Sequence, residues 1–245
     1  MVSPLVVIPA RLASTRLPGK PLADISGKPM ILHVLDAAVR ANIGPVIIAA
    51  AEQEICDVVS RAGGRAVLTD PQLPSGSDRT WQAVQQVDPD GQYDVIINLQ
   101  GDLPTFNPAD LREVLHVMDT PGFDIGTLVA PVTSEEEASA PSVVKTACHF
   151  SDESPHASAL YFSRQPIPWG DGPRWHHVGV YAWRRAALER FVSLPPSGLE
   201  KRESLEQLRA LEAGMRIGCA RIAHAPFGVD TPADLDPSRP LLGAQ

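Results

Sequence analysis

Three cations, Arg11, Arg16 and Lys20, lie in one short segment, residues 10–20, that contains no carboxylate. Positive side chains on one tight loop repel each other unless an anion lies among them, so the segment indicates a phosphate-binding loop. The same spacing also fits a basic loop that is simply exposed to solvent and binds no anion. The segment does not match the pattern G-x-x-x-x-G-K-[ST], because Pro21 follows Lys20.

A candidate metal ligand, Asp102, follows the apolar run 95–97 in the sequence Gln100-Gly101-Asp102-Leu103-Pro104. The cationic segment follows a similar apolar run, residues 5–8. In open α/β sheets ligands bind beyond the carboxyl ends of the strands, so both segments should face one pocket. A carboxylate there, opposite cations, is a natural Mg²⁺ ligand. A plain turn is the other interpretation of this sequence.

A second candidate carboxylate, Asp230, precedes a typical helix start. Thr231 as N-cap, Pro232 at the first helical position and Asp234 in the first turn are explained by local capping. Capping does not explain Asp230. Its position just outside the cap leaves it free to point into the pocket.

Hydrophobic patterns predict the elements that position these residues. In the first half we expect strands at 5–9, 45–50, 65–69 and 94–99, and helices at 29–42, 52–62 and 78–88. The apolar face of the first helix runs from Met30 to Val39, and Gly44-Pro45 should end it. This alternation is typical of βαβ units around a mainly parallel sheet.

The pattern changes after residue 120. Residues 124–132, 142–150 and 175–183 read as longer strands without intervening helices, which predicts an antiparallel subdomain. Helices are expected at 185–193 and 200–213, the latter with Leu205, Leu208 and Leu211 facing inward and its charges mostly solvated. A strand follows near 215–222, and the Pro-rich tail 236–245 is expected to be loose.

Composition excludes several classes of function. The chain has 245 residues, 44% of them hydrophobic, which is enough for one large α/β domain or two small ones. Its formal net charge of -8 disfavours nucleic acid as a partner. Three cysteines without C-x-x-C spacing argue against disulfides and zinc and fit a reducing compartment. No apolar run is long enough to span a membrane, so we expect a cytoplasmic protein without membrane insertion.

Read as a block, residues 7–22 resemble a family signature. Val-Ile-Pro-Ala-Arg-x-x-Ser-Thr-Arg-Leu-Pro-Gly-Lys-Pro-Leu is similar to the start of the sugar-activating nucleotidylyltransferases, in particular the 3-deoxy-manno-octulosonate (Kdo) cytidylyltransferases. Further matching motifs follow in the family's order as far as Leu235. The resemblance implies an α/β fold of the nucleotide-diphospho-sugar transferase type: a Rossmann-like, mainly parallel sheet flanked by helices, with an antiparallel insertion in the second half.

The same resemblance implies one nucleotidylyltransferase domain, residues 1–245, whose insertion at about 124–184 serves sugar binding and dimerisation. The implied enzyme is a Mg²⁺-dependent homodimer that converts CTP and Kdo into CMP-Kdo and pyrophosphate for lipopolysaccharide biosynthesis. Its positioned charges would do most of the catalytic work.

The resemblance also assigns roles to individual residues. The implied catalytic residues are Arg11, Lys20, Asp102 and Asp230, of which Asp102 and Asp230 hold the metal. The implied CTP-binding residues are Arg11, Arg16, Lys20, Ser75, Gly76, Arg79 and Gln100. The implied sugar-binding residues are Gln100, Arg164, His177, Tyr181, Glu206 and Gln207. Lys145 matches a Val-Lys strand of the family to which we assign no role.

Three positions depart from the family pattern: Leu103 replaces a glutamate, Pro74 a glutamine, and Ala51 an aspartate found in many relatives. They motivate one alternative, a nucleotide-binding sensor without catalysis. Another is acylneuraminate cytidylyltransferase, but its opening loop normally reads Arg-Gly-Gly-Ser, unlike residues 11–16 here. Whether the sugar is Kdo or its 8-amino relative is left open by the sequence.

Overall fold

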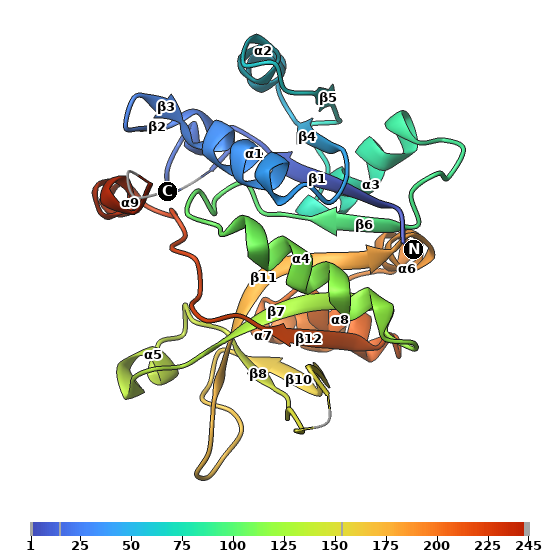
Figure 1. Ribbon diagram of the computed structural model, residues 1–245, viewed down its shortest axis with the longest axis vertical. Coiled ribbons are helices and arrows are strands. Elements are labelled where there is room, and N and C mark those ends of the chain that lie inside the picture. The colour runs from blue at the N-terminus through green and yellow to red at the C-terminus, as the bar shows by residue number, and fades with distance from the viewer. Residues whose placement is uncertain (1, 15, 153, 243–245) are drawn as a thin grey trace. The chain divides into compact units, whose positions relative to one another are not determined.

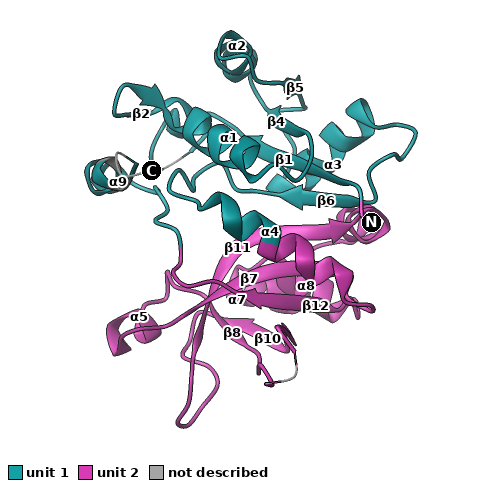
Figure 2. Ribbon diagram, viewed as in Figure 1, with its two compact units in different colours: residues 1, 3–112, 226–245 teal, residues 2, 113–225 magenta. Residues whose placement is uncertain are grey.

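The computed structural model of the chain describes residues 2–14, 16–152 and 154–242. The chain forms two compact units, coloured separately in Figure 2: unit 1 contains Ser3–Arg112 and Pro226–Gln245, and unit 2 contains Glu113–Ala225. Thr15 of the cationic segment lies outside the described residues. Within the described ranges, no helix is both long and apolar enough to cross a membrane.

Unit 1 is built on parallel strands in the order β5-β4-β1-β6. Their bounds are β1 (Pro4–Ala10), β4 (Val46–Ala50), β5 (Ala66–Leu68) and β6 (Val95–Asn98). The central strand β1 pairs on both sides, which buries residues such as Val7 and Ile8 completely. All four strands were predicted near their observed bounds, and for β1, β4 and β6 the reason is that strands covered on both faces read as continuous apolar runs.

Helices cover both faces of these strands. They are α1 (Met30–Ala41), α2 (Gln53–Arg61) and α3 (Gly76–Val87). Right-handed crossovers in this strand order put α1 and α2 on one face and α3 on the other, as the view in Figure 1 indicates for α1 and α3. Because the strands are parallel, the loops after β1, β5 and β6 emerge at one edge.

Smaller elements of unit 1 were not predicted. They are the hairpin strands β2 (Asp24–Ile25) and β3 (Lys28–Pro29), the 3-10 turns η1 (Lys20–Leu22) and η3 (Pro232–Asp234), and the helices α4 (Pro108–His116), which continues into unit 2, and α9 (Leu235–Leu242). The expectation of a loose tail was therefore wrong for residues 236–242, where Ser238 is fully buried; residues 243–245 lie outside the described ranges.

Two details of α1 also differ from expectation. Val39 is 57% exposed, so it does not belong to the buried face. The helix ends at Ala41, because Asn42 adopts a left-handed conformation with φ 51° before Gly44-Pro45 is reached. Asparagine tolerates this conformation better than most residues, so it ends the helix as glycine often does.

Unit 2 is organised around β7 (Ile125–Pro131), which pairs antiparallel with β11 (Trp175–Arg184) and parallel with β12 (Ile217–Arg221). Strand β8 (Lys145–Ala147) pairs antiparallel with β11 and β10 (Tyr161–Ser163), and β9 (His156–Ser158) pairs antiparallel with β12. The predicted antiparallel character of the second half is confirmed. The strand expected at 142–150 shrinks to three residues, and β9 and β10 are too short for a sequence pattern to reveal.

The helices of unit 2 are α5 (Glu135–Ser139), α6 (Arg185–Ser193), α7 (Gly198–Glu203) and α8 (Gln207–Glu212), with the 3-10 turn η2 (Val117–Asp119). Helix α5 lies between β7 and β8, where no helix was expected; Ser134 caps it by accepting from the Glu137 N–H. The single helix expected at 200–213 is two helices, because Ser204 is left-handed with φ 55°.

The charges of this region are less solvated than expected. Arg209 is buried and forms two hydrogen bonds with Glu200, Nε–Oε2 at 2.8 Å and Nη2–Oε1 at 2.5 Å. Its guanidinium also lies 4.6 Å from the ring centre of Phe191. Burial disfavours the Glu200 charge, but the hydrogen bonds from Arg209 and the Ser197 N–H prevail and lower its pKa. The pair thereby joins α7 to α8.

Replacing Arg209 with methionine should lower the free energy of unfolding by about 3 kcal/mol, because Glu200 would remain as a largely buried carboxylate without its cation. Urea denaturation followed by tryptophan fluorescence measures the change. The control is Lys201→Met, an exposed position on α7, with an expected effect below about 0.5 kcal/mol. Equal, small effects of both substitutions would contradict the structural role of the pair.

Candidate active site

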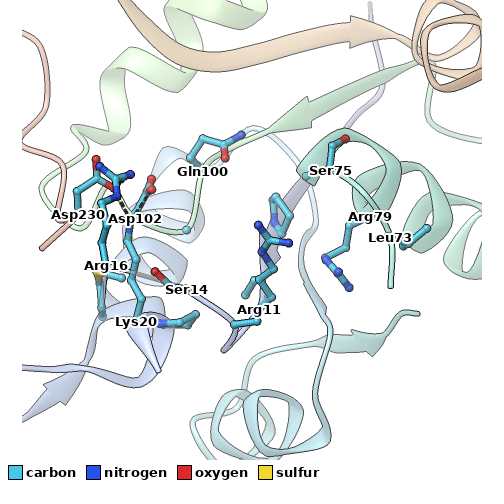
Figure 3. A pocket seen from close by; sticks show the side chains of 17 residues that line it. Arg11, Ser14, Arg16, Lys20, Leu73, Ser75, Arg79, Gln100, Asp102 and Asp230 are labelled. Carbon is cyan, nitrogen blue, oxygen red and sulfur yellow. Dashed lines mark hydrogen bonds and ion pairs between the residues drawn. The ribbon is translucent and has the colours of Figure 1, made fainter. Parts of the chain in front are cut away.

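The cationic segment and the Asp102 loop line one cleft of unit 1, with a volume of about 380 Å³, as predicted from the two strand ends (Figure 3). Its lining includes Arg11, Ser14, Arg16, Lys20, Leu73, Ser75, Gly76, Arg79, Gln100, Asp102 and Asp230. All predicted nucleotide-binding and metal-binding residues therefore lie in one place. Among described residues, no group of three or more His, Cys, Asp or Glu side chains could hold a metal by itself.

The two aspartates converge on Lys20. Its Nζ lies 2.8 Å from Asp102 Oδ2 and 2.8 Å from Asp230 Oδ1, and Arg16 Nη2 lies 3.1 Å from the same oxygen of Asp230. The Lys20 side chain is only 13% exposed. Carboxylates distant in the chain thus supply the anions that the cationic segment requires, and Figure 3 shows them together on one side of the cleft.

Backbone contacts hold the aspartates in this arrangement. The Val229 N–H donates to the Asp102 carbonyl at 3.0 Å, which ties the two segments together. Asp234 Oδ2 accepts from the N–H groups of Asp230 and Thr231, at 3.0 and 2.7 Å. Although burial opposes its charge, these bonds lower the pKa of Asp234. The capping predicted for this turn therefore also orients the residue just before it.

Leu103, which departs from the family pattern, has a packing role. Its Cδ2 lies 3.6 Å from the position that a Cβ on Gly228 would occupy, so the side chain lies next to the segment leading to Asp230.

The cationic segment folds back on itself. Gly19, with φ 68°, donates its N–H to the Leu12 carbonyl at 3.1 Å, and a residue with a Cβ would be strained there. The Leu12 N–H donates to Glu52 Oε2 at 2.9 Å. Glu52 thus anchors the loop from the start of α2. No sequence motif marked it, because its role depends on a contact between segments forty residues apart.

At the other side of the cleft lies Arg79, which is 2% exposed. Its Nη1 donates to Thr69 Oγ1 at 2.6 Å and to the Asp70 carbonyl at 3.0 Å, while its buried Nη2 has no hydrogen-bond partner among the described residues. Burial lowers the pKa of this guanidinium. An unused buried donor facing a cleft is suited to a polar ligand.

Ser75, Gly76 and Gln100, which were also predicted to bind CTP, differ in their local surroundings. Ser75 caps α3, accepting from the Asp78 N–H at 3.2 Å and donating to Asp78 Oδ2 at 2.7 Å. Gly76 leaves space beside Pro9 and Gln100, because a Cβ there would lie 3.5 and 3.9 Å from them. Gln100 Nε2 donates to Asn98 Oδ1 at 3.1 Å. The Gln100 amide is thus oriented at the cleft.

The other predicted sugar-binding residues lie in unit 2. His177, on β11, is buried, with its Nε2 3.1 Å from Thr127 Oγ1. The Thr127 hydroxyl donates to the Val180 carbonyl at 2.9 Å, so it accepts from a His177 Nε2–H. Burial, and to a lesser degree His176, lowers the pKa of His177 to about 3. The ring is therefore neutral at physiological pH.

Tyr181 lies near His177, and Glu206 lies near Tyr181. The His177 and Tyr181 ring centres are 5.6 Å apart, and burial followed by the Glu206 charge raises the pKa of Tyr181. Glu206 Oε1 lies 3.8 Å from Arg209. Gln207 is 6% exposed, and its Nε2 has no hydrogen-bond partner within the described part of the chain. Polar groups thus accumulate here without full mutual satisfaction.

Arg164 lies at the end of β10, where the backbone fixes it. Its Nε, Nη1 and Nη2 donate to the carbonyls of Glu203, Pro141 and Ser204, at 2.8, 2.9 and 3.2 Å. No carboxylate pairs with its guanidinium in the described ranges, and two of the five guanidinium N–H groups remain for a ligand. Sequence reasoning missed Glu203, whose carboxylate accepts from the Arg164 N–H, and named Lys145 without a role, although its Nζ donates to the Arg164 carbonyl.

Comparisons with known proteins agree on the family. The model of the cytidylyltransferase family matches residues 5–217. A 3-deoxy-manno-octulosonate cytidylyltransferase of Parvibaculum lavamentivorans is 61% identical over 98% of this chain and 92% of its own length. One of Rhodospirillum centenum is 58% identical, over 98% and 93%.

Solved structures agree with these relatives. CMP:2-keto-3-deoxy-manno-octonic acid synthetase complexed with CTP is similar with a TM-score of 0.90 and 40% identity, over 99% of both chains. A 4-diphosphocytidyl-2C-methyl-D-erythritol synthase of Anaerococcus prevotii shares the fold, with a TM-score of 0.64 at 11% identity. With its mainly parallel sheet, antiparallel second half and clustered charges, this chain belongs to the cytidylyltransferase family, among the 3-deoxy-manno-octulosonate cytidylyltransferases.

Proposed function

We propose that this protein transfers the cytidylyl group of CTP to Kdo, giving CMP-Kdo and pyrophosphate. The observation that carries the proposal is the convergence of Lys20, Asp102 and Asp230 in one cleft of a chain that belongs to this family. In the reaction the anomeric hydroxyl attacks the α-phosphorus in line as pyrophosphate leaves, which demands positioning and charge stabilisation rather than covalent catalysis.

Arg11, Arg16 and Lys20 supply the charge that a triphosphate needs. Arg11 is exposed in the cleft lining and has no ion pair with any described residue, so its charge is available to a phosphate. Arg16 and Lys20 line the same cleft and carry further positive charge. Cations fixed before the reaction stabilise the charge that develops on the leaving pyrophosphate.

Asp102 and Asp230 fit a Mg²⁺ ion. Both have an oxygen within 2.8 Å of a single atom, Lys20 Nζ, so the two carboxylates can contact one small cation. Two carboxylates without a full protein cage are the usual donors for Mg²⁺, whose other ligands come from water and phosphates. When bound, the ion neutralises phosphate charge and lowers the pKa of the attacking hydroxyl.

Base and sugar recognition are assigned to polar groups of each unit. The Arg79 Nη2 donor suits a carbonyl of the cytosine ring, with Ser75 and Gly76 shaping the start of α3 beside it. In unit 2, the two remaining Arg164 donors suit the carboxylate of the sugar acid. The Gln207 amide and the Glu206 carboxylate suit its hydroxyls, and the neutral His177 ring packs with Tyr181.

Further properties remain part of the proposal: a role in lipopolysaccharide biosynthesis, a cytoplasmic location and a homodimer formed through residues 124–184. The three free cysteines support a reducing compartment. The exposed Trp169, at 99%, lies in the proposed dimerisation segment and supports a partner surface there.

Purified protein with Mg²⁺ and CTP should release pyrophosphate when Kdo or its 8-amino analogue is added, but not with N-acetylneuraminate. A coupled pyrophosphate assay measures this, and comparison of kcat/KM for the two acids identifies the substrate. Release with N-acetylneuraminate instead would replace the proposed substrate. CTP binding without release from any sugar would indicate a nucleotide sensor.

Asp102→Asn and Asp230→Asn should each lower kcat at least about a hundredfold, because each removes a carboxylate from the paired arrangement around the metal. The fold should persist, as judged by circular dichroism and thermal melting. Asp90→Asn, on an exposed loop of unit 1, is the control and should leave kcat unchanged. A folded Asp102 variant with more than about a tenth of the wild-type rate would disprove its metal role.

A further inference from the structure

Lys145 on β8 is a fully buried cation that the proposed reaction leaves unused. Its Nζ donates to the carbonyls of Ala140, Val143 and Arg164, at 3.0, 2.7 and 2.6 Å. All three ammonium N–H groups are therefore satisfied by neutral oxygens. Within the described ranges no carboxylate forms an ion pair with it.

Burying a lysine without a counter-charge is costly, because the charged form loses its hydration. Burial, with a contribution from the Arg164 charge, lowers the pKa of Lys145. An uncharged hydrogen-bond donor in place of the ammonium could join two carbonyls of this loop at a lower desolvation cost. A role that depends on the positive charge of Lys145 would account for this cost.

That role is indicated by Arg164, whose backbone is held from both sides. Its carbonyl accepts from Lys145, and its N–H donates to Glu203 Oε2 at 3.1 Å. The Glu203 carboxylate also accepts from the Ser163 hydroxyl at 3.0 Å, so it contacts backbone and hydroxyl groups instead of the guanidinium. Both backbone polar groups and three guanidinium donors of Arg164 are thus fixed.

The charges around Arg164 do not balance. Lys145 and Arg164 carry two positive charges against the single negative charge of Glu203. The Glu137 carboxylate has other partners: it accepts from the Thr133 N–H at 2.9 Å and lies 3.1 Å from His176 Nδ1. Lys145, Arg164 and Glu203 together therefore carry one excess positive charge, whose exposed part is the half-buried Arg164 guanidinium.

We propose that Lys145 is a positioning residue for sugar-acid recognition: it fixes the Arg164 backbone and adds its own charge to the field that attracts the sugar carboxylate. The inference rests on the proposed function, because it requires an acidic sugar at Arg164. Carbonyl oxygens satisfy the lysine without neutralising it, so its attraction for an anion is retained in a poorly screened interior.

Lys145→Met tests the proposal, with KM for Kdo and for CTP measured separately. We expect KM for Kdo to rise at least about tenfold while KM for CTP and kcat at saturating Kdo stay within about twofold. Two controls are matched to the site. Thr146→Val changes the adjacent buried residue, whose Oγ1 has no hydrogen-bond partner among described residues. Lys201→Met removes a nearby but exposed charge. Both controls should leave KM for Kdo unchanged.

A double substitution separates positioning from general damage. Because Lys145 acts partly through Arg164, Lys145→Met should raise KM for Kdo by a clearly smaller factor when it is added to Arg164→Met than when it is made in the wild-type protein. Additive effects, or equal increases of both KM values in Lys145→Met, would overturn the proposal.

If Lys145→Met does not fold, Lys145→Gln, which keeps two N–H donors without the charge, is measured instead. Failure of both to fold would make the residue purely structural and would also overturn the inference. Wild-type protein that releases no pyrophosphate with any sugar acid would overturn the proposed function itself. An active wild type with an unchanged KM for Kdo in the variant would overturn the Lys145 inference alone.

Discussion

The nucleotide cleft depends on one ammonium group shared by two carboxylates. Lys20 Nζ holds Asp102 and Asp230, residues that are 82 and 210 positions away from it in the chain. Without these anions, the cations of residues 10–20 would repel each other on a single loop. The parallel sheet brings Lys20 and Asp102 to one edge, and Asp230 lies just before the 3-10 turn η3. The fold of unit 1 thus brings two cations and two carboxylates together in one cluster at the cleft.

The cationic side chains of unit 2 have different hydrogen-bond partners from those of unit 1. Lys145 and Arg164 donate mainly to carbonyl oxygens, and Arg164 has no carboxylate on its guanidinium among the described residues. Arg209, by contrast, is closely paired with Glu200 and supports packing. The distinction between the two arginines is physical: a neutralised guanidinium stabilises the fold, whereas one bound only to carbonyls keeps its attraction for an anion.

The sequence predicted what depends on local pattern. Strands β1, β4 and β6 are mainly apolar because both faces are buried, and the capping signal at Thr231 acts within a few residues. The predicted meeting of residues 10–20 with the Asp102 loop followed from strand direction alone. The inclusion of Asp230 could not be deduced from spacing, and it came from the family resemblance.

Other features could not have been predicted, because they depend on long-range contacts. Glu52 anchors the cationic loop through one backbone N–H, and Glu203 meets Arg164 across 39 positions. The buried pairing of Arg209 looked like a solvated charge, since an amphipathic pattern does not show which polar residue has a partner. Strands of three residues, such as β9 and β10, are shorter than the period needed to recognise them.

The order of segments along the chain has a consequence for biosynthesis. Unit 1 is interrupted after Arg112 and resumes only at Pro226, so the ribosome makes all of unit 2 before it supplies Asp230. During that interval Lys20 and Asp102 can meet, but the second carboxylate does not yet exist. The nascent protein therefore carries this cleft in an incomplete form until residues 226–230 have been made.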